Sequence, residues 1–137
     1  MGCLLSLLNS CKSGTNEKLS GKNSLNWIID SGASHHMTGS LACMTDLKEL
    51  LGCAVGLPDG NQTMALKEGS VRLGEYIKLK NALYVPNLNC NLISVSQLLD
   101  ELDCFILFTK KLCVIQDPAS RMVIGAGERR EGLYYLK

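Results

Sequence analysis

The sequence has few aromatic residues, almost no net charge and no long apolar run. Phe, Trp and Tyr make up 5% of the 137 residues, so a core must rest on Leu, Ile, Val and Met. The formal net charge of +1 gives no electrostatic reason to expect a nucleic-acid partner. No apolar run approaches the roughly 20 residues that span a bilayer, so a membrane is not an expected partner. A single modest domain remains the simplest expectation.

The seven cysteines contain no C-x-x-C pair, and their number is odd. This spacing argues against a zinc ribbon and against a closed disulfide framework, and it favours free thiols in a reducing compartment. The start of the chain, Met1-Gly2-Cys3, fits the short N-myristoylation pattern, so acylation at Gly2 stays an open alternative. His35, His36 and Cys43 also raise a metal site, but adjacent side chains of an extended segment point to opposite faces. No metal and no cofactor are therefore expected.

The chain changes composition at Leu25. Residues 1–24 are rich in Ser, Gly, Asn and Lys and are predicted to be a disordered linker. Leu41 to Leu51 fits a short helix or an irregular turn, and Leu92 to Leu102 fits a helical stripe. Short strands are predicted for residues 27–29, 53–57, 63–73 with an interruption at Gly69, 76–79, 82–85, 105–108, 112–115 and 122–124. Many short strands and one late helix predict a mainly β protein, with a small closed β-barrel as the leading fold.

One short segment carries most of the chemical signal. Asp30 follows a buried apolar strand and is itself followed by Ser31, Gly32 and Ala33. The strand fixes the carboxyl group, while Gly32 lets a backbone N–H approach a carboxylate oxygen and Ser31 can bond to neighbouring backbone. Taken alone the tripeptide is also typical of a turn at a strand end. No G-x-S-x-G elbow or phosphate loop supports a serine hydrolase or a nucleotide enzyme.

The surrounding residues extend this signal into a family resemblance. Trp27-Ile28-Ile29-Asp30-Ser31-Gly32-Ala33-Ser34-His35-His36-Met37-Thr38 resembles the active-site segment of copia-type retrotransposon proteases, relatives of the retroviral aspartic proteases. Leu57-Pro58-Asp59-Gly60 is similar to the flap hairpin of that family. The stretch from Asn81 to Leu98 resembles the segment that leads into its helix, and Gly132 to Leu136 resembles the start of the pre-integrase region. The resemblance covers about residues 25–137.

The resemblance implies a fold and a division of the chain. The fold is a retropepsin-like closed β-barrel with one short helix in its C-terminal half. Residues 25–116 are expected to form the protease barrel, and residues 117–137 a β-hairpin at the junction to the pre-integrase region. Residues 1–24 are expected to be a remnant of the upstream gag region.

The resemblance also implies an aspartic endopeptidase of a copia-type retrotransposon Pol polyprotein, cleaving its own Gag-Pol polyprotein. Asp30 is the expected catalytic residue, with Ser31, Gly32 and Ala33 as the active-site loop. One chain carries one such triplet, so a homodimer must bring two carboxylates together to share a proton and activate water. The turn of Pro58, Asp59 and Gly60 is expected to be a flap over the polyprotein peptide. The expected location is the cytoplasm, within the virus-like particle of the parent element.

The chain departs from retroviral relatives at two places near the expected site, and a second function stays open. Ser94 stands where they have glycine before the helix, and the Pro58 turn lacks their glycine-rich tip. The alternative is a catalytically silent β-barrel fragment of a retrotransposon, kept as a binding module or present as a relic. An intact Asp30-Ser31-Gly32 triplet favours the enzyme, whereas the missing flanking regions of the family favour the silent fragment.

Overall fold

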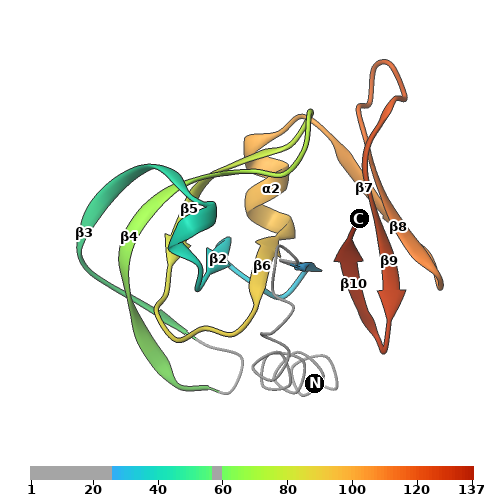
Figure 1. Cartoon of the computed structure of the whole chain (residues 1–137). Helices are drawn as coiled ribbons and strands as arrows, with labels where there is room; N and C mark the ends of the chain where they lie inside the picture. Colours follow the sequence, from blue (N-terminus) through green and yellow to red (C-terminus); the bar gives the residue numbers. More distant parts are fainter. Residues whose placement is uncertain (1–25, 57–59) are drawn as a thin grey trace.

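The computed structural model describes residues 26–56 and 60–137 (Figure 1). Over these residues the chain is mainly β, with one short α-helix and one 3-10 helix. The elements are β1 (Trp27–Asp30), β2 (Met37–Thr38), η2 (Leu41–Cys43), β3 (Thr45–Gly56), β4 (Gln62–Arg72), β5 (Lys78–Tyr84), β6 (Asn91–Ser94), α2 (Val95–Glu101), β7 (Phe105–Phe108), β8 (Leu112–Gln116), β9 (Val123–Arg130) and β10 (Leu133–Leu136).

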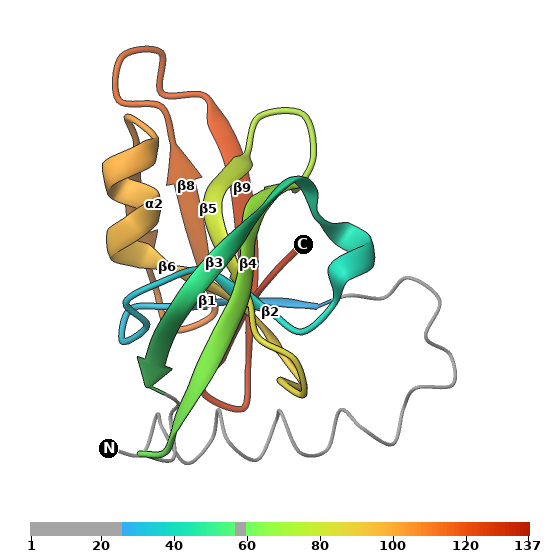
Figure 2. The same cartoon turned by 90° about the vertical axis from the view of Figure 1, so that its left-hand side faces the viewer.

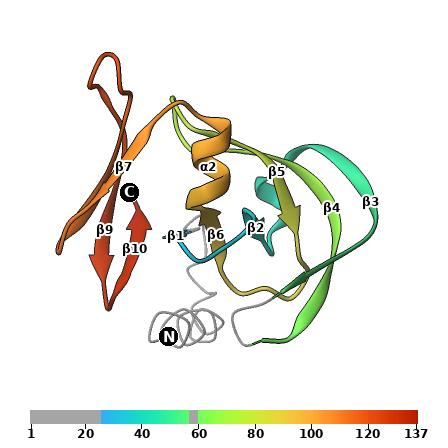
Figure 3. The ribbon, with the colours of Figure 1, turned by 180° about the vertical axis from the view of Figure 1, so that it is seen from behind.

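The strands form one ten-stranded sheet with the order β3-β4-β5-β2-β6-β1-β10-β9-β8-β7. Within the described residues β3 and β7 are its two edges, so the sheet is open and the closed barrel is not confirmed. Figure 3 shows β3 to β5 on one side of α2 and β7 to β10 on the other. For the described ranges, the expectation of a mainly β chain with one short helix in its C-terminal half is confirmed.

β1 lies in the middle of the sheet and is buried on both of its faces. Ile28 packs into a cluster with Met37, Leu83 and Leu92. Its neighbours Trp27 and Ile29 point the other way, into a second cluster that includes Leu79, Ile93 and Leu98. A strand covered on both faces has a continuous apolar sequence, which is why the Trp27–Ile29 signal is short and unbroken.

The segment Leu41 to Leu51 differs from its expected conformation. Only Leu41–Cys43 is helical, as the 3-10 turn η2, and β3 begins at Thr45. The apolar residues of this segment do not alternate as in a regular strand, because the β3–β4 pairing shifts register between Glu49 and Cys53. A bulge of this kind interrupts the two-residue alternation of a strand. Leu51 consequently points fully into solvent.

β4 and the turn before it agree with the sequence where the structure describes them. The β4–β5 pairing shifts register between Gly69 and Val71, at the expected interruption. A Cβ on Gly69 would lie 2.7 Å from the Thr45 carbonyl oxygen, so glycine permits this close approach. Gly60 has the positive φ of 89° that the turn prediction requires. Pro58 and Asp59 lie outside the described residues.

The C-terminal strands are arranged as an antiparallel meander that closes onto β1. β7 pairs with β8, β8 with β9 and β9 with β10. β10 then pairs with β1, with Ile28 opposite Tyr135 and Ile29 opposite Tyr134. β9 and β10, from the expected junction segment 117–137, are thus hydrogen-bonded to strands of the segment 25–116. The proposed boundary at residue 116 stays a prediction.

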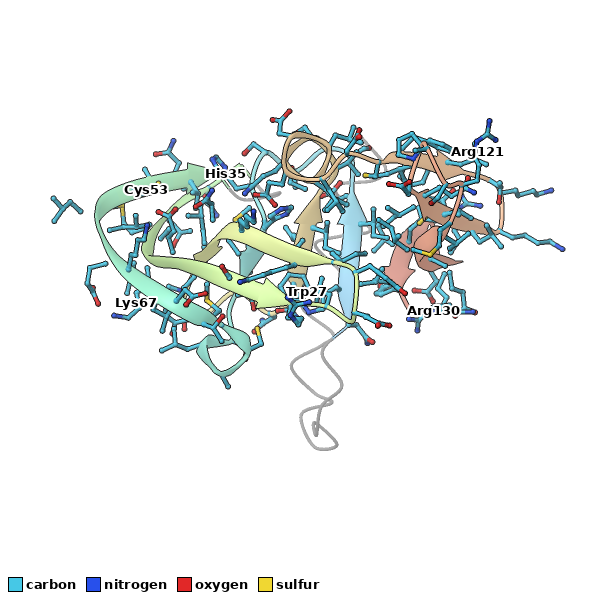
Figure 4. The ribbon with its side chains drawn as sticks, turned by 90° about the horizontal axis from the view of Figure 1, so that it is seen from above. Trp27, His35, Cys53, Lys67, Arg121 and Arg130 are labelled. Atoms are coloured by element: carbon cyan, nitrogen blue, oxygen red, sulfur yellow. The ribbon has the colours of Figure 1, made fainter. Side chains whose placement is uncertain are left out.

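Figures 2 and 4 give the shape of the two ends of the sheet. β3 and β4 are long and curved, and α2 lies beside the sheet (Figure 2). Lys67 and Cys53 mark the β3–β4 end, while Arg121 and Arg130 mark the opposite end (Figure 4). Across the described residues, no helix is both long and apolar enough to cross a membrane. The expectations for residues 1–24, including Gly2, fall outside the described ranges.

Of the cysteines that the structure describes, all but Cys90 agree with the sequence expectation. Cys43, Cys53, Cys104 and Cys113 are free thiols. Cys90 is disulfide-bonded, so the expectation of free thiols is wrong for this residue.

Candidate functional site

Asp30 is the last residue of β1 and is fixed by strands on both sides of β1. On one side β1 runs parallel to β6, which places Asp30 opposite Ser94. On the other side β1 is antiparallel to β10. Because the preceding three residues are buried while Asp30 is only half-buried, the carboxyl group emerges at the end of a rigid strand. The sequence expectation of a carboxylate positioned by a buried strand is confirmed.

The loop after Asp30 folds back on its carboxyl group. The backbone N–H of Gly32 donates to Asp30 Oδ1 at 2.9 Å. The N–H of Ala33 points to the Asp30 carbonyl oxygen at a longer 3.4 Å. The expected bond from Gly32 to the carboxylate is therefore present. A Cβ on Gly32 would meet Asp30 Oδ1 at an ordinary 3.5 Å, so space alone does not demand glycine there.

The outer part of the same loop is open to solvent. Ser31, Gly32, Ser34 and His35 are all exposed or partly exposed. Ser34 and His35 contact one another, with the hydroxyl and Nδ1 2.9 Å apart. Among the described residues the Ser31 hydroxyl makes no hydrogen bond, so it remains available to an external partner. The loop thus presents a carboxylate and a hydroxyl on the surface of the subunit.

Ser94 holds the inner part of the loop. Its hydroxyl donates to the Ala33 carbonyl oxygen at 2.7 Å and accepts the N–H of Gln97 at 3.1 Å. The second bond makes Ser94 the N-cap of α2. Glycine at this position could make neither bond.

His36 is fully buried and connects the loop to β6 and α2. Its Nδ1 accepts the N–H of Ser94 at 3.0 Å, and its Nε2 lies 3.1 Å from Glu101 Oε1. Since an N–H donates to Nδ1, that nitrogen carries no proton, and Nε2 is the donor to the carboxylate. Burial lowers the pKa of His36 below 6.5, although Glu101 acts in the opposite direction. The imidazole is therefore neutral and held in one tautomer.

Two side chains of α2 complete this network. Gln97 Oε1 accepts the backbone N–H of His36 at 2.9 Å, and Gln97 Nε2 donates to Glu101 Oε2 at 2.7 Å. Glu101 Oε1 also accepts the backbone N–H of Lys80, on β5, at 3.2 Å. Gln97 Nε2 in addition reaches the carbonyl oxygen of Lys80 at 2.8 Å. No buried side-chain N or O atom in the described ranges lacks a hydrogen-bond partner.

The local sequence did not predict this network, because it does not distinguish His35 from His36: both are expected to be polar side chains beside the loop. The structure separates them, with His35 exposed and His36 buried. A usable signal is the spacing of Gln97 and Glu101, four residues apart and so on one face of a helix. His36 is also followed directly by the two buried residues of β2, Met37 and Thr38.

A shallow cavity of about 170 Å³ opens beside Asp30. Its walls come from the end of β1 and the loop after it, from β7, from the β9–β10 turn and from the start of β10: Ile29, Asp30, Ser31, Phe108, Gly132, Leu133 and Tyr134. Phe108 and Tyr134 meet edge to face with ring centroids 4.9 Å apart. Tyr134 is further fixed by donating its hydroxyl hydrogen to the Thr109 carbonyl oxygen at 2.6 Å. Ile29, Phe108 and Leu133 are apolar, and Asp30 is the only carboxyl group among these lining residues. The cavity therefore suits an apolar group.

The remaining site predictions concern the turn of Pro58, Asp59 and Gly60. Gly60 lies in the β3–β4 connection and is exposed, and its expected flap partners Pro58 and Asp59 are not described. The flap role of all three stays a prediction. In the ranges 26–56 and 60–137, no group of three or more His, Cys, Asp or Glu side chains is placed to hold a metal ion.

The fold and the site together define a class: a β-rich module that presents one Asp-Ser-Gly loop at the end of a doubly buried strand. A model of the Pol polyprotein beta-barrel domain matches residues 27–104, which include that loop, β6 and α2. The chain belongs to the family of the Pol polyprotein beta-barrel domain.

Two relatives from Arabidopsis thaliana support this assignment. The chain is 30% identical over 116 residues to the retrovirus-related Pol polyprotein from transposon RE1, and 29% identical over 116 residues to that from transposon RE2. Each match covers 82% of this chain and 8% of the relative, so the chain spans a small part of these retrotransposon polyproteins. No solved structure matches the chain.

Proposed function

We propose that this chain is the aspartic endopeptidase of a retrotransposon Pol polyprotein, active as a homodimer. The observation that carries the proposal is the carboxyl group of Asp30, which stands half-exposed at the end of a strand buried on both faces. The Gly32 N–H binds one of its oxygens at 2.9 Å and so orients it. A fixed carboxylate at an accessible surface is what proton transfer to or from a bound water requires.

The homodimer follows from the chemistry. Cleavage by a water molecule needs one carboxylate to accept a proton and a second, neutral one to donate to the scissile carbonyl. The sequence contains a single Asp-Ser-Gly triplet, so a two-fold axis beside Asp30 supplies the second copy. The outer loop of Ser31, Gly32, Ser34 and His35 is the surface that would face this axis. The Ser31 hydroxyl is available for a bond across it.

The substrate is an extended segment of the element's own Gag-Pol polyprotein, cleaved in the cytoplasm or in its virus-like particle. The cavity beside Asp30 would take an apolar side chain next to the scissile bond, because Phe108, Leu133 and Tyr134 form its walls. The Gly60 turn, together with Pro58 and Asp59, would close over the peptide as a flap.

The decisive test compares the full chain with Asp30→Asn on two probes at pH 5. One probe is a fluorescence-quenched octapeptide library, and the other is a recombinant Gag-Pol segment of a copia-type element. Asparagine keeps the size of the side chain but cannot act as a carboxylate, so cleavage should fall by at least about 100-fold. A statine-type transition-state mimic should block the wild-type reaction.

The matched control is Asp100→Asn, because Asp100 is an exposed carboxylate on α2. It should leave cleavage unchanged. Equal cleavage by Asp30→Asn and the wild type would remove Asp30 from the mechanism. A dimeric wild type that cleaves neither probe would instead support the catalytically silent fragment as the function.

A further inference from the structure

The backbone of the Asp30 loop is attached to the rest of the subunit at its inner end. The Ala33 carbonyl oxygen accepts the hydroxyl hydrogen of Ser94 at 2.7 Å. Ser94 is fully buried, and its own backbone N–H is bound by His36 Nδ1 at 3.0 Å. Asp30 stands opposite Ser94 in the parallel β1–β6 pair. Ser94 therefore touches the strand end and the loop that together carry Asp30.

His36, which accepts the Ser94 N–H, is itself held in one orientation by hydrogen bonds. Its backbone N–H is fixed by Gln97 Oε1 at 2.9 Å, and its ring is fixed at both nitrogens, by Ser94 and Glu101. The ring cannot rotate without losing two bonds in a site that excludes water. Because a buried polar group left unpaired destabilises the fold, one orientation of the ring is strongly preferred.

We propose that His36 is a positioning residue for Asp30: its neutral imidazole, with the proton on Nε2 toward Glu101, holds Ser94, and Ser94 holds the loop. The inference rests on the proposed proteolytic function for its kinetic consequence, but the attachment itself is independent of catalysis. His36 touches neither Asp30 nor the cavity in the described contacts, so its role is to orient rather than to react.

The bond between His36 Nδ1 and the Ser94 N–H forms only while the imidazole ring is neutral. A protonated imidazole has a proton on Nδ1 and can no longer accept the Ser94 N–H. The groups that face the ring are the Glu101 carboxylate from α2, the neighbouring His35 from the loop and the Ser94 N–H from β6. From β5, Lys80 contributes only a backbone N–H, which binds Glu101. Glu101 thus favours protonation of the ring, and burial opposes it.

The first test uses two substitutions at His36 in the full chain. His36→Asn places an amide oxygen near the position of Nδ1 and can still accept the Ser94 N–H, whereas His36→Leu removes both ring contacts. Turnover per active site, titrated with a statine inhibitor, should fall about 10- to 100-fold in His36→Leu with little change in KM. His36→Asn should recover most of that loss.

The second readout does not depend on activity. Amide hydrogen exchange of Gly32 and Ala33, measured by NMR, should accelerate in His36→Leu while the amides of β4 and β5 keep the wild-type rate. If the two loop amides exchange at the wild-type rate in folded His36→Leu, the inference is overturned even where the chain cleaves peptides. If the loop loosens in His36→Leu although the wild-type chain never cleaves, the inference stands and the proposed function falls.

A third variant covers the case in which His36→Leu does not fold. Glu101→Gln keeps an acceptor for Nε2–H but removes the charge that favours a protonated ring. The pH below which loop protection and turnover are lost should then move downward. If the pH below which loop protection and turnover are lost is the same in Glu101→Gln and the wild type, the charge on His36 does not control the loop and the proposal is overturned.

Discussion

The imidazole Nδ1 of His36 accepts the backbone N–H of Ser94 across 58 positions of sequence, at 3.0 Å. This bond joins the loop after β1 to the start of α2. Because Glu101 takes the other ring nitrogen, a fully buried histidine carries its only proton on a defined atom. The stability of the fold therefore depends on the protonation of one residue.

The free energy of unfolding should fall as the pH drops below about 6.5. Burial lowers the pKa of His36 in the folded state, so the unfolded chain binds this proton first and stability rises with pH over that window. The loss should level off once the pH is below the folded pKa. Urea unfolding between pH 7.5 and pH 5 measures the slope. His36→Asn should flatten it, and an equal slope in this variant would assign the pH dependence to other groups.

Replacement of Thr38 by valine should destabilise the chain by about 1–3 kcal/mol. The Thr38 hydroxyl donates to Asn91 Oδ1 at 2.6 Å in a buried pair, and valine keeps the shape but leaves the amide oxygen unpaired. Chemical unfolding at pH 7.5 measures the change. The control is Thr45→Val, an exposed strand position whose substitution should stay within about 0.5 kcal/mol. Equal losses in the two variants would contradict the role of the pair.

Gly39→Ala should cost more than about 2 kcal/mol, because a Cβ there would lie 2.1 Å from the Leu88 carbonyl oxygen. Backbone must move to relieve this contact. Gly56→Ala is the matched comparison, since a methyl group added there would have no atom within 4 Å. Thermal unfolding of the two variants separates a steric effect from the general effect of replacing glycine. Similar melting temperatures would refute the close contact.

The Cys113 thiol should resist alkylation in the folded chain. It is fully buried, and burial raises its pKa, so little thiolate forms and reagent has no access. At pH 8 iodoacetamide should modify Cys53, which is half-buried, on the order of 10-fold faster or more. Peptide mass spectrometry gives the two labelling rates. In a guanidinium chloride solution that unfolds the chain, the rates of Cys113 and Cys53 should converge. Fast labelling of native Cys113 would contradict its burial.

Phe108→Ala should raise KM for peptides with a large apolar residue next to the scissile bond and leave KM for small residues nearly unchanged. The ring forms one wall of the cavity beside Asp30 and packs edge to face against Tyr134. Losing an apolar wall weakens binding by about 1–3 kcal/mol per group in such pockets. Steady-state kinetics on paired peptides measure the difference. Leu107→Ala, a more exposed residue on the same strand, is the control, and equal effects would remove the cavity from substrate recognition.

Local sequence signals identified some of the elements closely and others only in part. β1, β7 and β8 agree with the expected strands, because each is a short apolar run bounded by polar or turn residues. The helical stripe from Leu92 is only partly right, since its first three residues form the end of β6. Leu92 and Ile93 are apolar because they face the two core clusters from a strand. A buried strand and a buried helix cannot be separated by periodicity over so few residues.

What the sequence alone determined is the chemistry available: an apolar strand that ends in Asp30, a following loop able to bind the carboxylate, and a single such triplet in the chain. The tertiary structure decided which residues hold the Asp30 loop in place. Ser94, His36 and Glu101 meet because β1 runs parallel to β6 and α2 follows directly. That pairing is driven by burial of both faces of the two strands, and burial depends on partners far along the chain. No local pattern around Asp30 contains that information.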